Sequence, residues 1–342
     1  MRNTFFILII SLFFATCSAQ KKNQQTFSTV FYNVENLFDT VDDPLTMDEE
    51  FTPQSEKKWD AQKYRKKLDD LARVLSRIFA DELPEVIGLA EVENRTVLED
   101  LVNTSDLKKG GYQIIHADSP DQRGIDVALL YRKDELKDVY YETIQISFPF
   151  DSSETTRDIL YVRGRAPDGK DLHVFVNHWS SRRDGMKESE PKRMYSAASL
   201  RRKIDLLLSQ ESDPRIIIMG DFNDEPTNRS VMSGLLAGNK RKNTGTGDLY
   251  NLFYDQHNLE NKGTYYFRGT WNMLDQIMVS YNLVNVPGYY SCDYQDGAIF
   301  SEDWMMYENQ DGLKVPNRTY GGPNYYGGVS DHWPIVVRFS ID

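Results

Sequence analysis

The stretch Ile216–Glu225, IIIMGDFNDE, decides the fold of this chain. Its apolar run before Gly220 is too short for a helix, and its β-branched residues predict a buried strand. Gly220 marks a turn, and Asp221 and Asn223 follow it. Asp and Asn are ordinary turn formers, but strand-like spacing also turns both side chains to one side. The stretch therefore predicts a strand end that can build a site.

Polar residues recur where other apolar, strand-like runs end. Such runs are predicted at 26–33, 85–90 and 172–177, and the polar residues at strand ends are Asn33, Glu91, Asn177, His178, Asp221, Asn223, Asp275, Asp331 and His332. Loops held by a rigid sheet are where sites are built. Carboxylates, amides and imidazoles without thiols suit a hard cation, so we expect Mg²⁺ or Mn²⁺ as cofactor.

Helical periodicity appears in three segments between the predicted strands. Residues 59–80 carry an amphipathic stripe, and helices are also predicted at 95–102 and 191–208. Hairpins beside short strand–helix units indicate one α/β domain over 26–342, with a mixed sheet or two packed sheets and helices outside. The basic pairs at 182–183 and 192–193 are expected on a solvated face.

The N-terminal residues 1–19 resemble a targeting segment, with Arg2 followed by an apolar run too short to span a bilayer. Either Cys17 is a lipidation site, or the chain is cleaved before Gln20. A polar linker at 20–25 follows. We expect an exported protein: an outer-membrane or surface lipoprotein attached through lipidated Cys17, or alternatively a periplasmic or secreted one.

Charge and cysteine content narrow the function further. The chain has 342 residues and a net charge of −12, which makes it a poor non-specific polyanion binder without excluding a local positive groove. Apart from Cys17 the only cysteine is Cys292, so no Cys/His zinc site is expected. A monomer is expected.

Taken together, these motifs resemble the endonuclease/exonuclease/phosphatase superfamily of deoxyribonuclease I. The matching motifs come in the family's order over roughly Thr26 to Ser340: YNVENL, the Glu after VIGLA, NHW, GDFND, LDQI and SDHWP. The resemblance implies an α/β (α+β) four-layer sandwich, in which two mixed β-sheets pack face to face with helices outside. It also implies cleavage of phosphate esters with a divalent metal.

The same resemblance implies roles for individual residues. Glu91 is expected to be the principal metal ligand, with Asn33 beside it and Asp331 on the metal side. Asp221 and Asn223 are expected to orient or activate the attacking water and to bind the phosphate.

Two histidines complete the expected site. His332 is expected to transfer a proton or bind phosphate while Asp275 holds it, and either Asp221 or His332 could deprotonate the water. His178 could protonate the leaving oxygen, with Asp126 as its carboxylate partner. At this position the chain resembles the deoxyribonuclease and sphingomyelinase branches, which carry His, whereas the abasic-site endonucleases carry Tyr.

The sequence therefore predicts a metal-dependent hydrolase whose first expected substrate is nucleic acid, DNA or RNA. A phosphatase or phospholipase C-like enzyme acting on inositol phosphates, another phosphorylated small molecule or a sphingolipid is the alternative. A non-catalytic, ligand-binding surface lipoprotein is the alternative from another class.

Overall fold

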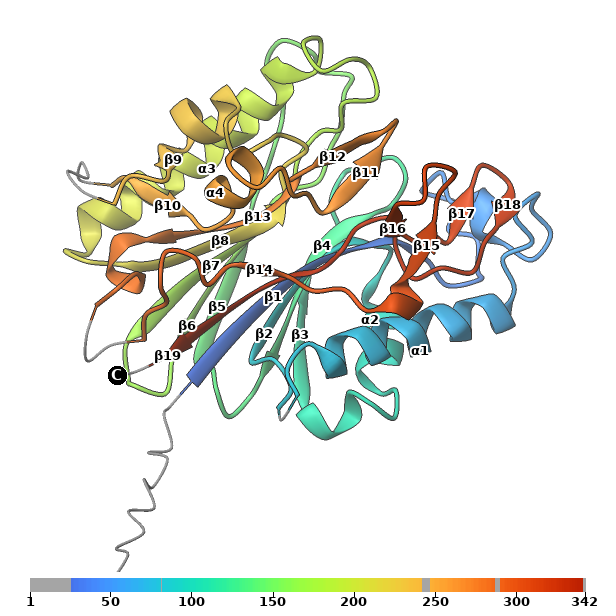
Figure 1. Ribbon diagram of the computed structural model, residues 1–342, viewed down its shortest axis with the longest axis horizontal. Helices are drawn as coiled ribbons and strands as arrows, with labels where there is room; N and C mark the ends of the chain where they lie inside the picture. The colour runs from blue at the N-terminus through green and yellow to red at the C-terminus, as the bar shows by residue number, and fades with distance from the viewer. Residues whose placement is uncertain (1–25, 81, 242–246, 287–289, 341–342) are drawn as a thin grey trace, which may run out of the picture.

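The computed structural model describes residues 26–80, 82–241, 247–286 and 290–340, and these form the fold shown in Figure 1. The predicted signal segment at 1–19, with Cys17, and the linker at 20–25 lie outside the described residues. No helix within the described ranges combines the length and the apolar character that crossing a bilayer requires.

Two large mixed sheets dominate the structure. The first has six strands in the order β14 (Ala298–Ile299), β19 (Ile335–Ser340), β1 (Thr26–Leu37), β2 (Val86–Val92), β4 (Asp126–Arg132) and β3 (Tyr112–His116). The second has seven, in the order β5 (Lys137–Ile144), β6 (Ile159–Arg165), β7 (Asp171–His178), β8 (Arg215–Asp221), β13 (Asp275–Ser280), β10 (Leu249–Asn251) and β9 (Ala237–Gly238).

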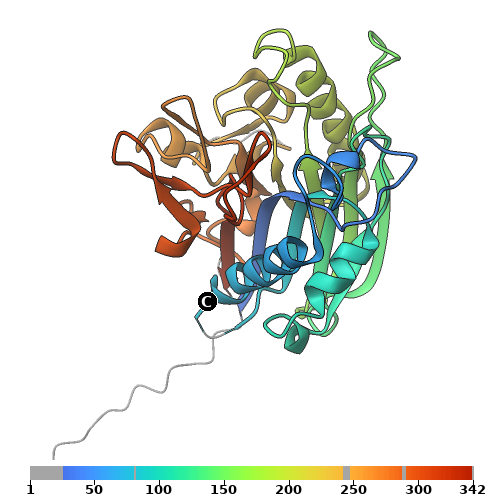
Figure 2. The same ribbon diagram turned by 90° about the vertical axis from the view of Figure 1, so that its right-hand side faces the viewer.

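Helices cover the outer faces of both sheets, as the two views in Figures 1 and 2 show. The helices are α1 (Ala61–Arg77), α2 (Arg95–Val102), α3 (Glu190–Gln210) and the short α4 (Tyr254–Asn258). Apolar residues of α1 and α2 pack against the first sheet, and those of α3 pack against the second. The expected four-layer α/β sandwich is therefore confirmed.

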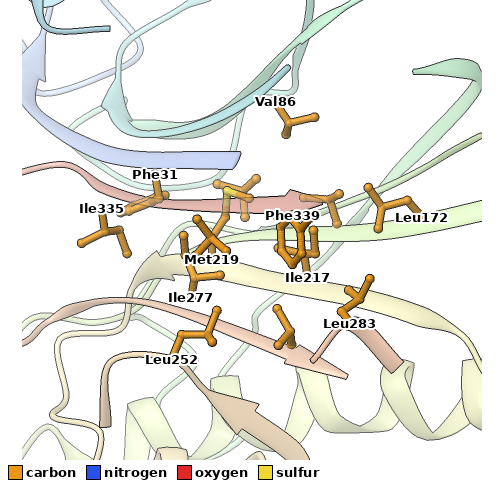
Figure 3. Packing of buried hydrophobic residues seen from close by; sticks show 14 of the residues in the cluster. Phe31, Val86, Leu172, Ile217, Met219, Leu252, Ile277, Leu283, Ile335 and Phe339 are labelled. Atoms are coloured by element: carbon orange, nitrogen blue, oxygen red, sulfur yellow. The ribbon is translucent and has the colours of Figure 1, made fainter. Parts of the chain in front are cut away.

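The main hydrophobic core lies between the sheets (Figure 3). Phe31 from β1 and Met219 from β8 are both fully buried in it. Gly88 on β2 leaves room for this packing, because a Cβ there would lie 2.6 Å from the Met219 sulfur. The close approach of the sheets thus depends on a glycine in the middle of a strand.

The C-terminal third contains more regular structure than its sequence predicts. The long segment at 281–328 forms small two-stranded pairs, and another lies just before it. These strands are β11 (Tyr265–Phe267), β12 (Thr270–Asn272), β15 (Met306–Glu308), β16 (Lys314–Pro316), β17 (Tyr320–Gly321) and β18 (Asn324–Tyr325). Short 3-10 or π-helical turns within the described residues lie at Glu49–Phe51, Lys108–Gly110, Ser230–Gly234, Tyr281–Leu283 and Asp303–Met305.

Candidate active site

Sheet topology brings the predicted polar residues to one edge of the sandwich. In each sheet two parallel strands, joined through α1 or α3, lie side by side: β1 with β2, and β7 with β8. Their carboxyl ends carry Asn33, Glu91, His178 and Asp221. The antiparallel strands β13 and β19 begin at the same edge, so Asp275 lies directly opposite Asp221 in the register.

Both strands of the first sheet bend sharply where they carry site residues. The backbone of Glu91 has φ +64°, and the β2 register shifts between Ala90 and Val92. In β1, Glu35 and Asn36 have φ values of 51° and 56°. The Asn36 N–H donates to Glu91 Oε2 over 3.0 Å, so the two bends hold the Glu91 carboxylate in place. Such strained backbone is typical of functional sites.

Glu91 and Asp331 make up the side of the site that fits a metal. Burial raises the pKa of Asp331, and the Glu91 charge adds to this effect while the charge of His332 opposes it. Arg318 also lies close, with its Nη2 3.7 Å from Asp331 Oδ2. Two neighbouring carboxylates of this kind suit a hard divalent cation, so the donor set fits the expected metal. Asn33 is also expected on this side; its Nδ2 donates to Asp221 and its Oδ1 accepts the Glu35 N–H over 3.0 Å.

Asp221 is the centre to which the other side chains converge. Asn33 Nδ2 donates to Asp221 Oδ2 over 3.0 Å, and the Asn223 N–H donates to Oδ1 over 2.9 Å. The Nε2 atoms of His178 and His332 lie 3.8 and 3.9 Å from Asp221 Oδ2. Burial and then the Asp275 charge raise the pKa of Asp221 to about 6, although the charge of His332 opposes this.

His332 is held as a cation. Its Nδ1 lies 2.7 Å from Asp275 Oδ2, and the Thr264 hydroxyl also donates to that oxygen, over 2.5 Å. Burial alone would lower the pKa of His332, but the Asp275 charge and hydrogen bond, with the Asp221 charge, raise it well above its usual value. Tyr265 stacks on the ring at 4.8 Å between centroids. Asp221, Asp275 and His332 keep potential ligand atoms within 4.8 Å of one another.

His178 is buried and electrically different from His332. Burial lowers its pKa well below the usual value, and the charges of Arg157 and Arg123 lower it further. Its Nε2 lies 3.8 Å from Glu91 Oε1, and its buried Nδ1 has no hydrogen-bond partner among the described residues. A neutral imidazole of this kind is a hydrogen-bond donor or acceptor rather than a strong proton donor.

The expected pairing of Asp126 with His178 is wrong. Asp126 Oδ2 lies 3.0 Å from His116 Nε2, and its Oδ1 accepts from the Ser119 N–H over 2.8 Å. The physical reason is the sheet order: Asp126 opens β4, which pairs with β3 and its His116, whereas His178 ends a strand of the other sheet.

The structure also reveals contacts that position the site and that the sequence did not indicate. The Ser330 hydroxyl donates to the Asn33 carbonyl over 2.7 Å and accepts the His332 N–H over 3.0 Å, so it joins the first strand to the last. Asn223 has φ 49°, and its Nδ2 donates to the Trp179 carbonyl over 3.0 Å. Ser330 is the first residue of the SDHWP motif, and its place directly before Asp331 and His332 is the sequence signal that could have indicated it.

Two arginines expected on a solvated face instead support the Asp221 loop. Arg193 is fully buried, with Nε 2.8 Å from Asp224 Oδ1. Arg182 Nε donates to the Asn223 carbonyl over 2.6 Å. The expectation is wrong for both, because each reaches polar groups of the loop after β8, far away in the sequence.

Comparison with known proteins agrees with this geometry. The model of a family described as "Endonuclease/Exonuclease/phosphatase family" matches residues 28–340. No curated protein sequence matches the chain.

Several solved structures share the fold. An endonuclease/exonuclease/phosphatase family protein from Bacteroides thetaiotaomicron has a TM-score of 0.57 at 17% identity, covering 93% of this chain and 99% of its own. The mannosyl-6-phosphatase Bt3783 from the same species has a TM-score of 0.55 at 17% identity, covering 92% and 99%. D. rerio TDP2, complexed with a single-strand DNA product, has a TM-score of 0.55 at 15% identity, covering 92% and 98%.

Proposed function

The chain belongs to the Endonuclease/Exonuclease/phosphatase family, and from this premise we propose that it is an exported, Mg²⁺-dependent nuclease that hydrolyses phosphodiester bonds of DNA or RNA. The chain is a phosphoesterase, and the enzymes of its family depend on a divalent metal. Nucleic acid as substrate, Mg²⁺ rather than Mn²⁺, and export are the parts that we propose.

One observation carries this proposal: residues from both sheets meet around Asp221. Glu91 and His178 are 3.8 Å apart, and His178 and His332 lie 3.8 and 3.9 Å from the Asp221 carboxylate. A phosphate group bound beside these atoms would contact a cationic donor, a neutral donor and a carboxylate at once. This is the set of groups that in-line attack by water on phosphorus needs.

The charge states favour Asp221 over His332 as the base. His332 already carries a proton that Asp275 stabilises, so it cannot accept another. Asp221, with a pKa of about 6, is ionised at neutral pH. It accepts a proton from water as the water oxygen bonds to phosphorus and the bond to the leaving oxygen breaks. Asn223 fixes the carboxylate by donating to Oδ1.

The two histidines then hold the phosphoryl group. The cationic His332 donates from Nε2 to a phosphoryl oxygen, where negative charge is concentrated. The neutral His178 places its Nε2 between Glu91 and Asp221 and orients the group by a weaker hydrogen bond. Glu91 and Asp331, with Asn33 beside them, would hold the Mg²⁺, which when bound stabilises negative charge on the phosphoryl oxygens as a Lewis acid.

A phosphorylated small molecule, such as a sugar phosphate, is the second candidate substrate. The net charge of −12 opposes long polyanions without opposing a small phosphate ester. A structure that shares this fold is a mannosyl-6-phosphatase. A phospholipase C-like enzyme, the other alternative, would use the same chemistry with a lipid as the leaving group.

A substrate panel separates these possibilities. The purified protein is incubated with plasmid DNA, an RNA, a sugar phosphate and a phosphocholine lipid, with Mg²⁺ or with chelator. Chelator-sensitive cleavage of plasmid or RNA supports the nuclease. Release of phosphate from the sugar phosphate alone, or of phosphocholine alone, would contradict it and support the second candidate. No turnover of any of these substrates, with a ligand still bound, would support the ligand-binding lipoprotein instead.

Export is tested separately, by locating the protein in fractionated cells. We propose that residues 1–19 direct export and that Cys17 carries a lipid anchor. A Cys17→Ser variant should then move from the membrane fraction to the soluble exported fraction. A protein that stays in the cytoplasm would contradict the proposal of export.

A further inference from the structure

A small hairpin that belongs to neither large sheet lies against the catalytic histidine. Its strands, β11 and β12, pair with each other (orange in Figure 1), and Tyr265 of β11 forms an isolated bridge with His332. We propose that this hairpin binds a nucleotide of a single-stranded substrate: the Phe267 ring stacks on an unpaired base, and Arg268 binds a phosphate next to the scissile one. The inference rests on the proposed nuclease activity and narrows its substrate class.

A row of aromatic rings leads from the catalytic centre to the surface. The Tyr265 ring stacks on the His332 ring with centroids 4.8 Å apart, and the Phe267 ring stacks on Tyr265 at 6.0 Å. Tyr265 and Phe267 share a face of the hairpin because they are two residues apart on one strand. His332 is 6% exposed, whereas Phe267 is 47% exposed. A substrate whose phosphate lies at His332 therefore meets an exposed ring two positions along this row.

The hairpin is fixed at its base by the strand that carries His332. The Thr264 N–H donates to the Asn272 carbonyl over 2.9 Å, and the Trp333 N–H donates to the Thr264 carbonyl over 2.9 Å. The rings of Trp271 and Trp333 also contact each other, with centroids 4.7 Å apart. Contacts of this kind hold a binding element in a defined position relative to the reacting atoms.

The tip of the hairpin carries an arginine in an unusual conformation. Phe267 pairs with Thr270, so Arg268 and Gly269 form a two-residue turn, and their φ values are 48° and 85°. Turns with two positive φ values favour Asn, Asp or Gly at the first position. An arginine there is strained, and strain of this kind is concentrated at ligand-binding and catalytic sites.

The Arg268 guanidinium is not committed to a carboxylate. Its central carbon lies 5.0 Å from the centroid of the Phe267 ring. Within residues 26–80, 82–241, 247–286 and 290–340, it has no ion-pair partner. A guanidinium offers paired donors that match phosphate oxygens. The tip of the hairpin therefore presents a cation for a phosphate beside a ring for a base.

Stacking supplies affinity that the charge of this chain does not. Binding to duplex DNA depends largely on cations that neutralise phosphates, and the chain has a net charge of −12. Stacking of a base on an aromatic side chain needs no net charge and accepts every base. The bases of a duplex are already stacked and paired, so they cannot reach Phe267. The hairpin thus favours single-stranded nucleic acid.

The test is steady-state kinetics of Phe267→Ala on a single-stranded oligomer of the nucleic acid that the wild-type protein cleaves. We expect KM to rise about 5- to 150-fold, which corresponds to the loss of one stacked base. The kcat should stay close to the wild-type value, because the ring does not touch the reacting atoms. Phe267→Trp should restore a low KM.

Tyr140→Ala is the matched control. Tyr140 is also 47% exposed and also has an arginine over its ring, Arg163 at 5.9 Å. It lies on β5, the outer edge strand of the second sheet. Its removal should leave KM unchanged.

A base-free oligomer separates stacking from phosphate binding. It has the same number of phosphates but abasic sugars throughout. The wild-type KM for it should rise by the same factor as that of Phe267→Ala on the normal oligomer, and Phe267→Ala should lose nothing further on it. This comparison uses the wild-type protein and so holds even if a variant fails to fold.

The salt dependence tests Arg268. A plot of log(kcat/KM) against log salt concentration should be less steep by about 0.7 for Arg268→Gln, the value for one phosphate contact on a single strand. Arg163→Gln, which removes an arginine from the Tyr140 ring, should keep the wild-type slope.

An unchanged KM in Phe267→Ala, an equal loss by Phe267→Ala on the base-free oligomer, or an unchanged slope in Arg268→Gln would overturn the hairpin as a nucleotide-binding element. These results require that the wild-type protein cleaves the oligomer. If it cleaves neither oligomer, the proposed nuclease activity itself fails, and the inference that rests on it fails too.

Discussion

At the scale of single residues, the chemistry of this site depends on two histidines with opposite charge states. Asp275 raises the pKa of His332 by its charge and its hydrogen bond, whereas burial and two arginines lower the pKa of His178. The same residue type therefore supplies a cation on one side of Asp221 and a neutral donor on the other.

Replacing Asp275 with Asn should shift the alkaline limb of the pH–rate profile. Without the carboxylate, the pKa of His332 falls, so the cationic form is lost at lower pH. A carboxylate at this distance is worth about 1–3 pKa units, and we expect the alkaline limb to move down by about that amount. The measurement is kcat from pH 5 to pH 10.

Asp126→Asn is the matched control, because Asp126 is also a buried carboxylate that contacts a histidine, His116, over 3.0 Å. Asp126 lies outside the site, so the pH–rate profile of the Asp126→Asn enzyme should keep the wild-type shape. An unshifted alkaline limb in the Asp275→Asn enzyme would contradict the assigned role of His332.

The acid limb of the pH–rate profile should reflect the ionisation of Asp221. Burial raises its pKa to about 6, and only the ionised form accepts a proton from water. A raised pKa means that this base is lost at higher pH than usual, so turnover should fall as the pH drops through about 6. A rate that stays constant down to pH 4.5 would exclude Asp221 as the base.

At the scale of elements, strand ends and helix caps set where the site residues lie. Asp60 caps α1 by accepting the N–H groups of Gln62 and Lys63 over 3.1 and 3.0 Å. Helix α1 joins β1 to β2, whose ends carry Asn33 and Glu91. The cap therefore contributes to the stability of the element that spans the metal side of the site.

Removing the cap with Asp60→Ala should lower the free energy of unfolding by about 1 kcal/mol, because two backbone donors lose their partner. Urea denaturation measures the change. Asp69→Ala on the exposed face of the same helix, where Asp69 pairs with Arg65, should cost no more than about 0.5 kcal/mol. Equal losses of unfolding free energy in the two variants would contradict a stabilising role of the Asp60 cap.

The sequence predicted the elements of the site better than their contacts. The buried runs and the amphipathic stripes identified β8, α1 and α2, since hydrophobic periodicity is a local property. The bends at Asn36 and Glu91 could not be predicted, because they require non-glycine residues at positive φ. The partners of Asp126 and Arg193 could not be predicted either, since both are set by sheet order and by a distant loop.

At the scale of the whole molecule, the close packing of the two sheets places both halves of the site together. Gly88 and Met219 meet in the core between them. Gly88→Val should overpack this contact and cost about 1–3 kcal/mol. Met219→Ala should cost about 2–5 kcal/mol by leaving a cavity.

In the double variant the valine enters the space that methionine leaves, so its cost should be less than the sum of the two single costs. Chemical denaturation of all three variants measures this coupling. Strict additivity would contradict the direct contact between the sheets.

The central claim is that residues from both sheets form one hydrolytic centre around Asp221. The most direct measurement is Mg²⁺-dependent phosphoester hydrolysis by the Glu91→Gln and Asp221→Asn variants, with folding checked by circular dichroism. The account predicts that each folded variant loses about 10²–10⁴ in kcat, although Glu91 belongs to a strand of the first sheet and Asp221 to a strand of the second. A near-wild-type rate in either folded variant would contradict it.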